Sequence, residues 1–273
     1  MKISTVTGLL VLGPFVLGLL ALGPVACGGA PGEVTATAAP ASDSPSPAGA
    51  ESPAGDALAL WNDLLAEHEV AGGLHYADLA GDRRLLDEYL AAVAGADLSA
   101  WSREEKLAFW INAYNALVAR GVLDRYPGLQ SVIEVEGFFD AERHTVAGEE
   151  LTLNELERKA LDLDEPRVHF AVVCASTGCP DLLGEAFTAR ALESQLSAQT
   201  AAFLADTAKG LRLDEGAGTL WLSSIFDWYA RDFGEDAVGW ILPLLPRDLA
   251  AKIRSTGPEV EFIDYDWSPN DRS

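Results

Sequence analysis

Residues 169–181 contain the densest group of reactive side chains in this sequence. His169 and Cys174 come first, and Cys179 is followed directly by Pro180. Proline is favoured at the first position of a helix and keeps the residue before it out of helical geometry, which predicts that Cys179 is a helix N-cap. There the unpaired N–H groups and the helix dipole favour thiolate over thiol. The pattern therefore indicates a cysteine nucleophile with His169 as its base.

A disulfide is the main alternative for the same two cysteines. Cys174 and Cys179 are separated by a turn, so the two sulfurs can approach each other, and pairing would remove the thiol. For His169 the alternative is a hydrogen-bonded histidine in the core. A zinc site is a weaker interpretation, because the spacing offers no CxxC or HxxxH element and no fourth ligand. We therefore expect no metal and no cofactor, while thiol and disulfide both stay open.

Two asparagines interrupt an apolar helix upstream of this region. The apolar residues of the segment 107–119 surround the helix axis, which predicts an interior helix, and Asn112 and Asn115 lie one turn apart in it. Buried amides need hydrogen-bond partners. They either bind the backbone of a nearby loop or belong to a catalytic site, where they would orient the base or donate to an oxyanion.

The elements that must position these residues are mostly helices. Apolar residues at helical spacing predict helices over 57–69 and 82–94. Capping boxes begin at Ser102, before the helix with both asparagines, and at Thr152, before a short helix to about residue 161. Later helices are expected over 188–206, from Ser224 to Phe233, and over 235–255 with a break at Pro246.

Strands are expected in the second half of the chain. The continuous apolar, β-branched run 167–175 predicts a central strand that carries His169. Residues 211–213 and 219–222 predict a hairpin, and 260–263 a closing strand. The expected fold class is α+β, a mainly helical single domain packed on a small β-sheet.

The first 27 residues have the composition of an export signal. Lys2 precedes an uncharged apolar run that contains several helix breakers. Residues 25–28 resemble a bacterial lipobox, in which Cys27 would be acylated. We expect a lipoprotein-type signal peptide over 1–27, with an ordinary signal peptide or an uncleaved anchor as alternatives. Each of these exports the rest of the chain to the cell envelope, on the periplasmic or outer face.

Residues 28–55 and 56–273 differ in composition. The first segment is almost entirely Gly, Ala, Pro, Ser and Thr, which predicts a disordered tether, and the second has the size of one globular domain. Nearly all of the net charge of −23 belongs to the second segment. A surface this negative repels phosphate backbones and anionic lipid. We expect no nucleic-acid partner, membrane contact only through the N-terminal anchor, and an unidentified substrate or protein partner.

Blocks of this sequence resemble a known family. They are FWINAYN from Phe109, PRVHFAVVCASTGCPDL from Pro166, LWLSSIFDWYARDF from Leu220 and YDWSPN from Tyr265. With these blocks in this order the chain resembles domain-of-unknown-function family 547 across about residues 72–270. The family has no settled activity and occurs in exported bacterial proteins and in plant proteins, some fused to glutaredoxin-like domains. The resemblance implies that the following match motif positions: Asn112, Asn115, His169, Cys179, Pro180, Ser223, Asp232 and Asp266.

Two functions of different classes are compatible with these residues. The first is a thiol-dependent hydrolase or acyl transferase, with Cys179 as nucleophile, His169 as base and Asn112 or Asn115 in support. The second is a non-catalytic ligand- or protein-binding domain in which Cys174 and Cys179 form a structural disulfide. A redox role, suggested only by the plant fusions, is a third option, because Cys-x4-Cys is not the CxxC of thioredoxin-type proteins.

Overall fold

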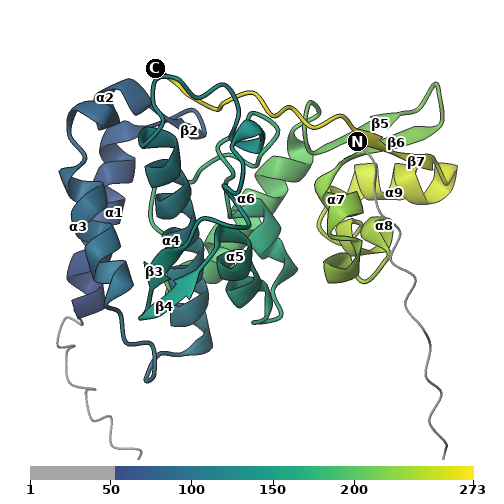
Figure 1. Cartoon of the computed structure of the whole chain (residues 1–273). Helices are drawn as coiled ribbons and strands as arrows, with labels where there is room; N and C mark the ends of the chain where they lie inside the picture. The colour runs from purple at the N-terminus through teal and green to yellow at the C-terminus, as the bar shows by residue number, and fades with distance from the viewer. Residues whose placement is uncertain (1–52) are drawn as a thin grey trace, which may run out of the picture. The chain divides into compact units, whose positions relative to one another are not determined.

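The computed structural model describes residues 53–273 (Figure 1). Helix α4 (Arg103–Leu123) runs through the interior of the helical part of this region. Its capping box is formed: the Ser102 hydroxyl accepts the N–H of Glu105, and the Glu105 carboxylate accepts the N–H of Ser102. Almost every side chain from Leu107 to Leu123 is buried, so the prediction of an interior helix is confirmed.

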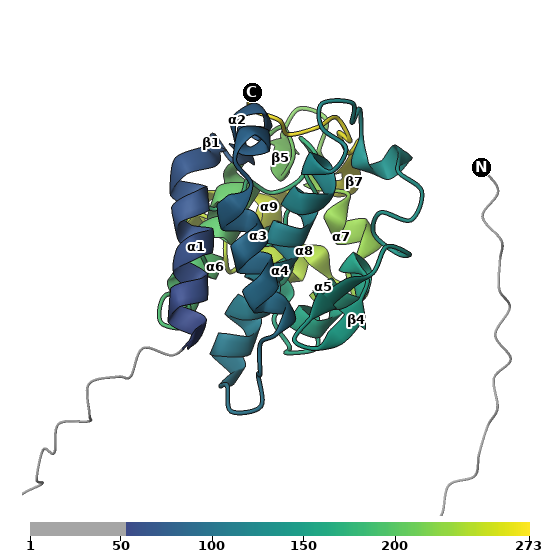
Figure 2. The ribbon, with the colours of Figure 1, turned by 60° about the vertical axis from the view of Figure 1, so that its left-hand side comes forward.

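Further helices that the sequence predicted pack around α4. Helix α1 (Pro53–His68) packs against α3 (Arg84–Ala94), α3 packs against α4, and α4 packs against α5 (Leu153–Leu161) (Figure 2). The second capping box is also present, between Thr152 and Glu155. The remaining small elements of this part are α2 (Tyr76–Gly81), η1 (Val132–Glu134) and the hairpins β1 (Glu69–Val70) with β2 (Gly73–Leu74) and β3 (His144–Val146) with β4 (Glu149–Leu151).

A three-stranded sheet forms the other end of the described region. The predicted hairpin pairs β5 (Leu211–Asp214) with β6 (Thr219–Ser223), and β7 (Glu259–Ile263) joins β6 in parallel. Short helices follow β6 and cover a second hydrophobic core: α7 (Ile225–Trp228), η3 (Ala230–Phe233), α8 (Ala237–Ile241) and α9 (Arg247–Thr256). Helices with small sheets confirm the predicted α+β class.

The central strand expected over 167–175 is wrong. The segment begins as a 3-10 helix, η2 (Pro166–Phe170), and continues without regular structure. It is buried as predicted, but its backbone is satisfied by a side chain instead of a sheet ladder: Asn115 Nδ2 donates to the Ala171 carbonyl, and Asn115 Oδ1 accepts the N–H of Val173. An apolar run indicates burial on all sides and does not by itself distinguish a strand from buried irregular chain.

The helix expected after Cys179 is also absent, so Cys179 is not an N-cap. Residues 181–190 are irregular, and α6 spans Leu192–Ala205 instead of beginning at 188. Contacts from distant residues hold the segment in this form. Leu182 donates its N–H to the Gly72 carbonyl, and Phe187 is bound at both backbone groups by Asn112.

Ser224 does not cap the next helix as predicted. Its hydroxyl donates to the carbonyl of Ile263 in β7, and the expected helix is divided into α7 and η3. The break at Pro246 is confirmed, because Pro246 directly precedes α9.

The segment that follows β7 returns across the molecule to the far end (Figure 1). Asn270 donates its N–H to the Ala175 carbonyl, and Arg272 donates to the Leu74 carbonyl. We call residues 264–273 the C-terminal strap. The strap passes over the cysteine-containing loop and joins the helical end to the sheet end.

The predicted signal peptide over 1–27 and the tether over 28–55 lie outside the described residues, apart from the few residues with which α1 begins. Within residues 53–273, no helix combines the length and the apolar character needed to span a membrane.

Candidate functional site

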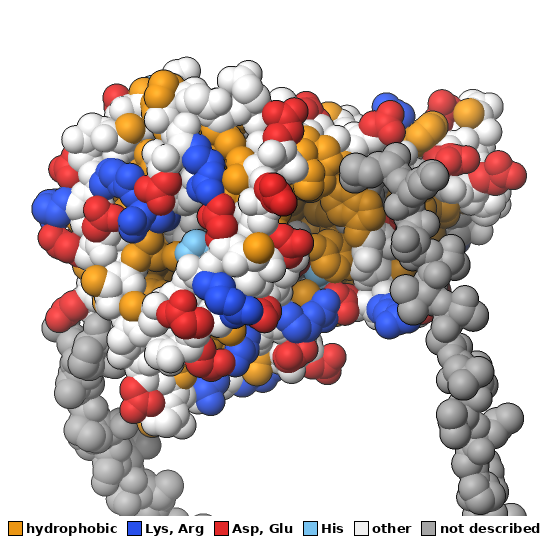
Figure 3. All heavy atoms as spheres, viewed as in Figure 1, with side chains coloured by type: hydrophobic (Ala, Val, Ile, Leu, Met, Phe, Trp, Pro, Cys, Tyr) orange, Lys and Arg blue, Asp and Glu red, His pale blue; other side chains and the backbone are white. Residues whose placement is uncertain are grey.

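A pocket of about 480 Å³ lies between the two hydrophobic cores and is lined by the following residues: Tyr114, Val132, Ile133, Val135, Glu136, Gly137, Phe138, Phe139, Asp140, Asn154, Glu157, His169, Val172, Cys174, Cys179, Pro180, Ile225, Trp228, Tyr229, Tyr265 and Trp267. Each of the sequence blocks that resemble family 547 contributes at least one of them. In Figure 3, hydrophobic side chains gather in a hollow on the face shown, with acidic side chains at its border. The blocks are therefore separate in sequence and converge on one cavity.

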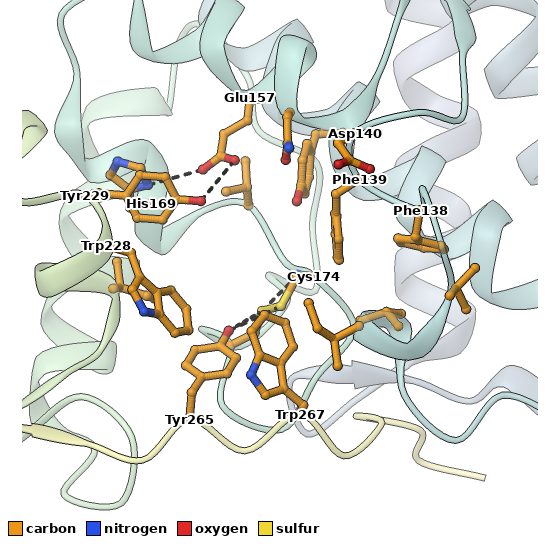
Figure 4. A pocket seen from close by; sticks show the side chains of 18 of the residues that line it. Phe138, Phe139, Asp140, Glu157, His169, Cys174, Trp228, Tyr229, Tyr265 and Trp267 are labelled. Carbon is orange, nitrogen blue, oxygen red and sulfur yellow. Dashed lines mark hydrogen bonds and ion pairs between the residues drawn. A yellow bond between two sulfur atoms is a disulfide. The ribbon is translucent and has the colours of Figure 1, made fainter. Parts of the chain in front are cut away.

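One side of the pocket is built around His169. Its Nε2 lies 3.0 Å from Asp232 Oδ2, and its Nδ1 lies 3.3 Å from Glu157 Oε1 (Figure 4). The imidazole is 1% exposed, and the ring of Tyr229 lies 4.1 Å away between centroids. We call Glu157, His169, Tyr229 and Asp232 the imidazole side. Helix α5, η2 and the adjoining α7 and η3 supply these residues.

The surroundings of the imidazole side favour an ionised Asp232 and a neutral Tyr229. Burial acts to raise the pKa of Asp232, but the hydrogen bonds from His169 and Arg158 outweigh it, and the pKa lies below its usual value. Burial, and then the nearby Glu157 carboxylate, raise the pKa of Tyr229 above its usual value. The Tyr229 hydroxyl is therefore neutral and donates to Glu157 Oε2 at 3.4 Å. Both nitrogens of His169 contact carboxylates, so neither is free to take a proton from a ligand unless one contact breaks.

The opposite side of the pocket contains sulfur and aromatic rings. Cys174 and Cys179 form a disulfide, and Cys179 Sγ accepts hydrogen bonds from the Tyr265 hydroxyl at 3.0 Å and from the N–H of Cys174 at 2.9 Å. Trp267 follows Tyr265 on the C-terminal strap, with 4.6 Å between the ring centroids. We call Cys174, Cys179, Tyr265, Trp267 and the adjacent Trp228 the sulfur side.

The disulfide changes the interpretation of the Cys179 and His169 pair. A sulfur in a disulfide is not a thiolate, so Cys179 is not a nucleophile in this form. Within the described residues, His169 is hydrogen-bonded to Asp232, its Nδ1 lies 3.3 Å from Glu157 Oε1, and no hydrogen bond joins it to Cys179. Both residues therefore line one pocket, but the cysteines are closed in a disulfide.

Asn112 and Asn115 lie outside this pocket and bind backbone, which is one of the two alternatives left open for them. Asn112 binds the N–H and carbonyl of Phe187, and Asn115 bridges Ala171 and Val173. Each amide thus uses its oxygen and its nitrogen to hold the chain on one flank of the cysteine loop. A catalytic role for these asparagines stays a prediction.

The other motif positions contact the site through the backbone or through neighbours. Ser223 is buried at the end of β6, and its hydroxyl accepts the N–H of Ile225. Asp266 accepts the N–H and hydroxyl of Ser268, which lower its pKa, and its carbonyl accepts the N–H of Gly178. A Cβ on Gly178 would lie 2.9 Å from the backbone nitrogen of Asp266, so this close approach of the strap requires glycine.

Two further motif positions, Pro180 and Asp232, belong to the site or contact it directly. Pro180 lines the pocket, and Asp232 binds His169 directly. Cys27 lies outside the described residues.

Several residues of the pocket were missed by sequence reasoning. Glu157 could have been found, because it lies within the buried stripe of α5 that includes Leu153, Leu156 and Ala160, and a carboxylate in an apolar stripe needs a buried partner. Four aromatic residues of the pocket lie within the sequence blocks quoted above, but their spacing did not show that they share one wall: Trp228, Tyr229, Tyr265 and Trp267.

No group of three or more His, Cys, Asp or Glu side chains in residues 53–273 has the arrangement to hold a metal ion.

Comparison with known proteins supports part of the resemblance. Residues 98–204 match the model of a family described as a protein of unknown function, DUF547, which supports membership of that family over this segment. The matched segment contains α4, α5, η2, the cysteine loop and α6. It ends before the following residues of the site: Trp228, Tyr229, Asp232, Tyr265 and Trp267. No curated protein and no solved structure matches the chain.

Proposed function

We propose that this chain, which matches a family of unknown function over residues 98–204, is a ligand-binding domain with a structural disulfide in the wall of its pocket. The observation that carries the proposal is the pocket itself, where the sequence blocks converge and where Cys174 and Cys179 are already paired. Its volume of about 480 Å³ suits a small molecule. Aromatic walls with a few fixed polar groups are typical of such sites.

The polar groups of the imidazole side already contact one another, which favours ligand binding over group transfer. His169 is held between two carboxylates, and Tyr229 donates to one of them. A base needs a free lone pair within reach of the proton it removes. In this arrangement the imidazole side supplies a rigid, polar wall.

Ligand binding by the pocket is tested with the full-length chain purified without reductant. Small molecules that bind the wild type are first identified by ligand-observed NMR. We expect their affinity for the Trp228→Ala variant to be about tenfold lower, because the variant lacks an exposed ring on which a ligand can stack. The matched control is Trp101→Ala, since Trp101 lies in a different pocket, lined by α1, α3 and α4. Equal loss in both variants, or no ligand at all, would overturn the proposal.

A second candidate is a thiol-dependent hydrolase or acyl transferase. One observation favours it: Cys179 and His169 line the same pocket. The enzyme would require reduction of the disulfide by a dithiol, which would free the Cys179 thiol, and then movement of His169 away from its carboxylates.

Alkylation separates the two candidates. Cys174→Ser leaves Cys179 as a free thiol, and Cys179→Ser leaves Cys174 as the matched control. A nucleophile activated by His169 would react with iodoacetamide faster at Cys179 than at Cys174 near neutral pH, and His169→Ala would slow it. Equal and slow reaction of the two thiols is the outcome expected of the binding domain.

We also propose that the chain is exported and anchored in the cell envelope through a lipid on Cys27. Support comes from the sequence of residues 1–27 and from the disulfide, which is stable in an oxidising compartment. Radiolabelled palmitate should enter the wild-type chain and not Cys27→Ala, and both should be found outside the cytoplasm. A wild-type chain without label would contradict the anchor.

A further inference from the structure

We infer that the pocket takes a small organic cation, a molecule with a primary or quaternary ammonium group. The inference rests on the proposed function and adds the chemical class of the ligand. Two independent features support it, the charge of the lining residues and the aromatic faces opposite the carboxylates.

The lining residues make the pocket negative under either charge state of its histidine. Glu136, Asp140 and Glu157 contribute carboxylates, and no Lys or Arg is among the residues of the described region, 53–273, that line the cavity. Among these lining residues, only the His169 side chain can carry positive charge. The carboxylates therefore outnumber it whether it is protonated or neutral, and the pocket attracts cations and repels anions.

Nearby arginines do not reverse this charge, because each is engaged elsewhere. Arg158 forms an ion pair with Asp232 behind His169, and Arg125 is paired with Glu142. Asp140, in contrast, has no hydrogen bond or ion pair with any residue of the described part of the chain. Its carboxylate is exposed at the rim of the pocket and is available to a ligand.

Aromatic faces form the wall opposite these carboxylates. Figure 4 shows Trp228, Tyr265 and Trp267 along one edge of the cavity, with Glu157 and Asp140 across it. The rings of Trp228 and Trp267 are stacked with 5.8 Å between centroids and 20° between planes. Burial raises the pKa of Tyr265 to about 12, so its hydroxyl stays protonated and the ring stays neutral. Aromatic faces attract ammonium groups through the ring quadrupole.

Other ligand classes fit one feature and not the other. A metal ion would need converging oxygen or nitrogen ligands, and residues 53–273 contain no group of three such side chains that could hold one. A neutral ligand such as a sugar would gain from the rings and gain nothing from the carboxylates. An organic cation gains from both.

The experiment compares choline with its uncharged isostere 3,3-dimethylbutan-1-ol and its anionic relative 3,3-dimethylbutanoate. Binding to the full-length chain is followed by the change in its tryptophan fluorescence, to which Trp228 and Trp267 in the pocket contribute. These probes share a shape and differ in charge. We expect choline to bind about tenfold more tightly than the alcohol, with the preference falling as salt is added, and the anion to bind most weakly.

Two variants test whether the preference for choline over the alcohol arises in this pocket. Asp140→Asn should weaken choline binding about threefold and leave the affinity for the alcohol unchanged, because it removes only charge. Asp97→Asn is the matched control, since Asp97 lies at the other pocket.

The outcomes distinguish failure of the ligand class from failure of the site. Equal affinity for choline and the alcohol, or a preference for the alcohol or the anion, overturns the inference of a cationic ligand. The proposed binding function then still stands if Trp228→Ala weakens the binding about tenfold and Trp101→Ala does not. Absence of saturable binding of all three probes overturns the cation as well. A search with unrelated neutral compounds that also finds no binding then overturns the proposed function.

Discussion

The imidazole side of the pocket is held by helical elements, whereas most of the sulfur side is held by irregular chain. Glu157 lies on α5, His169 on η2 and Asp232 on η3. Cys174 and Cys179 lie in a loop, and Tyr265 and Trp267 lie on the C-terminal strap. The loop is bound by Asn115 on one flank and by the strap on the other.

The two sides accordingly depend on different interactions. The imidazole side depends on contacts between one imidazole and two carboxylates, whose side chains are 1% to 21% exposed. The sulfur side depends on a covalent bond and on neutral hydrogen bonds. Removing the imidazole leaves both carboxylates without their partner, so we expect a larger effect from its loss than from changes on the sulfur side.

The largest effect is expected from His169→Leu. It leaves the carboxylates of Glu157 and Asp232 facing each other without the imidazole, and should lower the free energy of unfolding by about 3 kcal/mol. Chemical denaturation of the full-length chain measures it.

His75→Leu is the control for this prediction. His75 accepts the N–H of Asp78 at the start of α2, so its loss should cost about 1 kcal/mol, the cost of a helix cap. If His169→Leu costs no more than His75→Leu, the imidazole side is not held by its charges.

Removal of the disulfide should have the next largest effect. In the double variant Cys174→Ala and Cys179→Ala, loss of this short cross-link should lower the free energy of unfolding by about 2 kcal/mol. A reductant should destabilise the wild type by a comparable amount and leave the double variant unchanged. Reductant sensitivity that persists in the double variant would contradict a role for this cysteine pair.

A smaller effect is expected from Tyr265→Phe. The variant keeps the ring and removes the hydroxyl that donates to Cys179 Sγ, which should cost about 1 kcal/mol in urea denaturation. Tyr89→Phe is the control, because Tyr89 is a buried ring that stacks on Trp61 and makes no hydrogen bond through its hydroxyl within the described residues. Similar costs for the two variants would show that the hydrogen bond from the Tyr265 hydroxyl contributes little to stability.

The smallest effect concerns acid stability. The pKa of Asp232 is lower in the folded chain than its usual value near 4, so its contribution is present above that value and is lost as the pH falls through the lowered one. In Asp232→Asn, the free energy of unfolding should therefore fall less on acidification than in the wild type. The difference should be no more than about 1 kcal/mol, because the group is partly exposed.

Asp266→Asn is the comparison on the strap. The Ser268 hydrogen bonds also lower the pKa of Asp266, but its side chain is exposed and faces no histidine. Its effect on the fall in unfolding free energy on acidification should be smaller than that of Asp232→Asn. The reverse order would show that the contact with His169 contributes little to stability.

Sequence patterns predicted the helices around α4 because their causes are local. Apolar residues at helical spacing gave α1, α3 and α4, and side chains three residues apart formed the capping boxes at Ser102 and Thr152. The same reasoning failed for 167–175, since its apolar run is buried between two cores without strand partners. The pattern reported burial correctly and backbone conformation wrongly.

The pocket could be predicted only in part. His169, Cys174, Cys179 and Asp232 were singled out before their contacts were known, and all but Asp232 are among its lining residues. Their pairing was not predictable, because His169 and Asp232 are 63 positions apart and Tyr265 and Cys179 are 86 apart. No local propensity carries information about contacts at such separations.

By itself the sequence determined the acidic character of the chain, its mainly helical class, its buried amides and the two cysteines close enough to pair. Tertiary structure decided that His169 faces Glu157 and Asp232, that the Cys174–Cys179 pair is closed, and that the strap brings aromatic rings opposite carboxylates. The physical reason is the range of the interactions. Helix periodicity and caps act within one or two turns, whereas the pocket forms where two cores and a returning C-terminal segment meet.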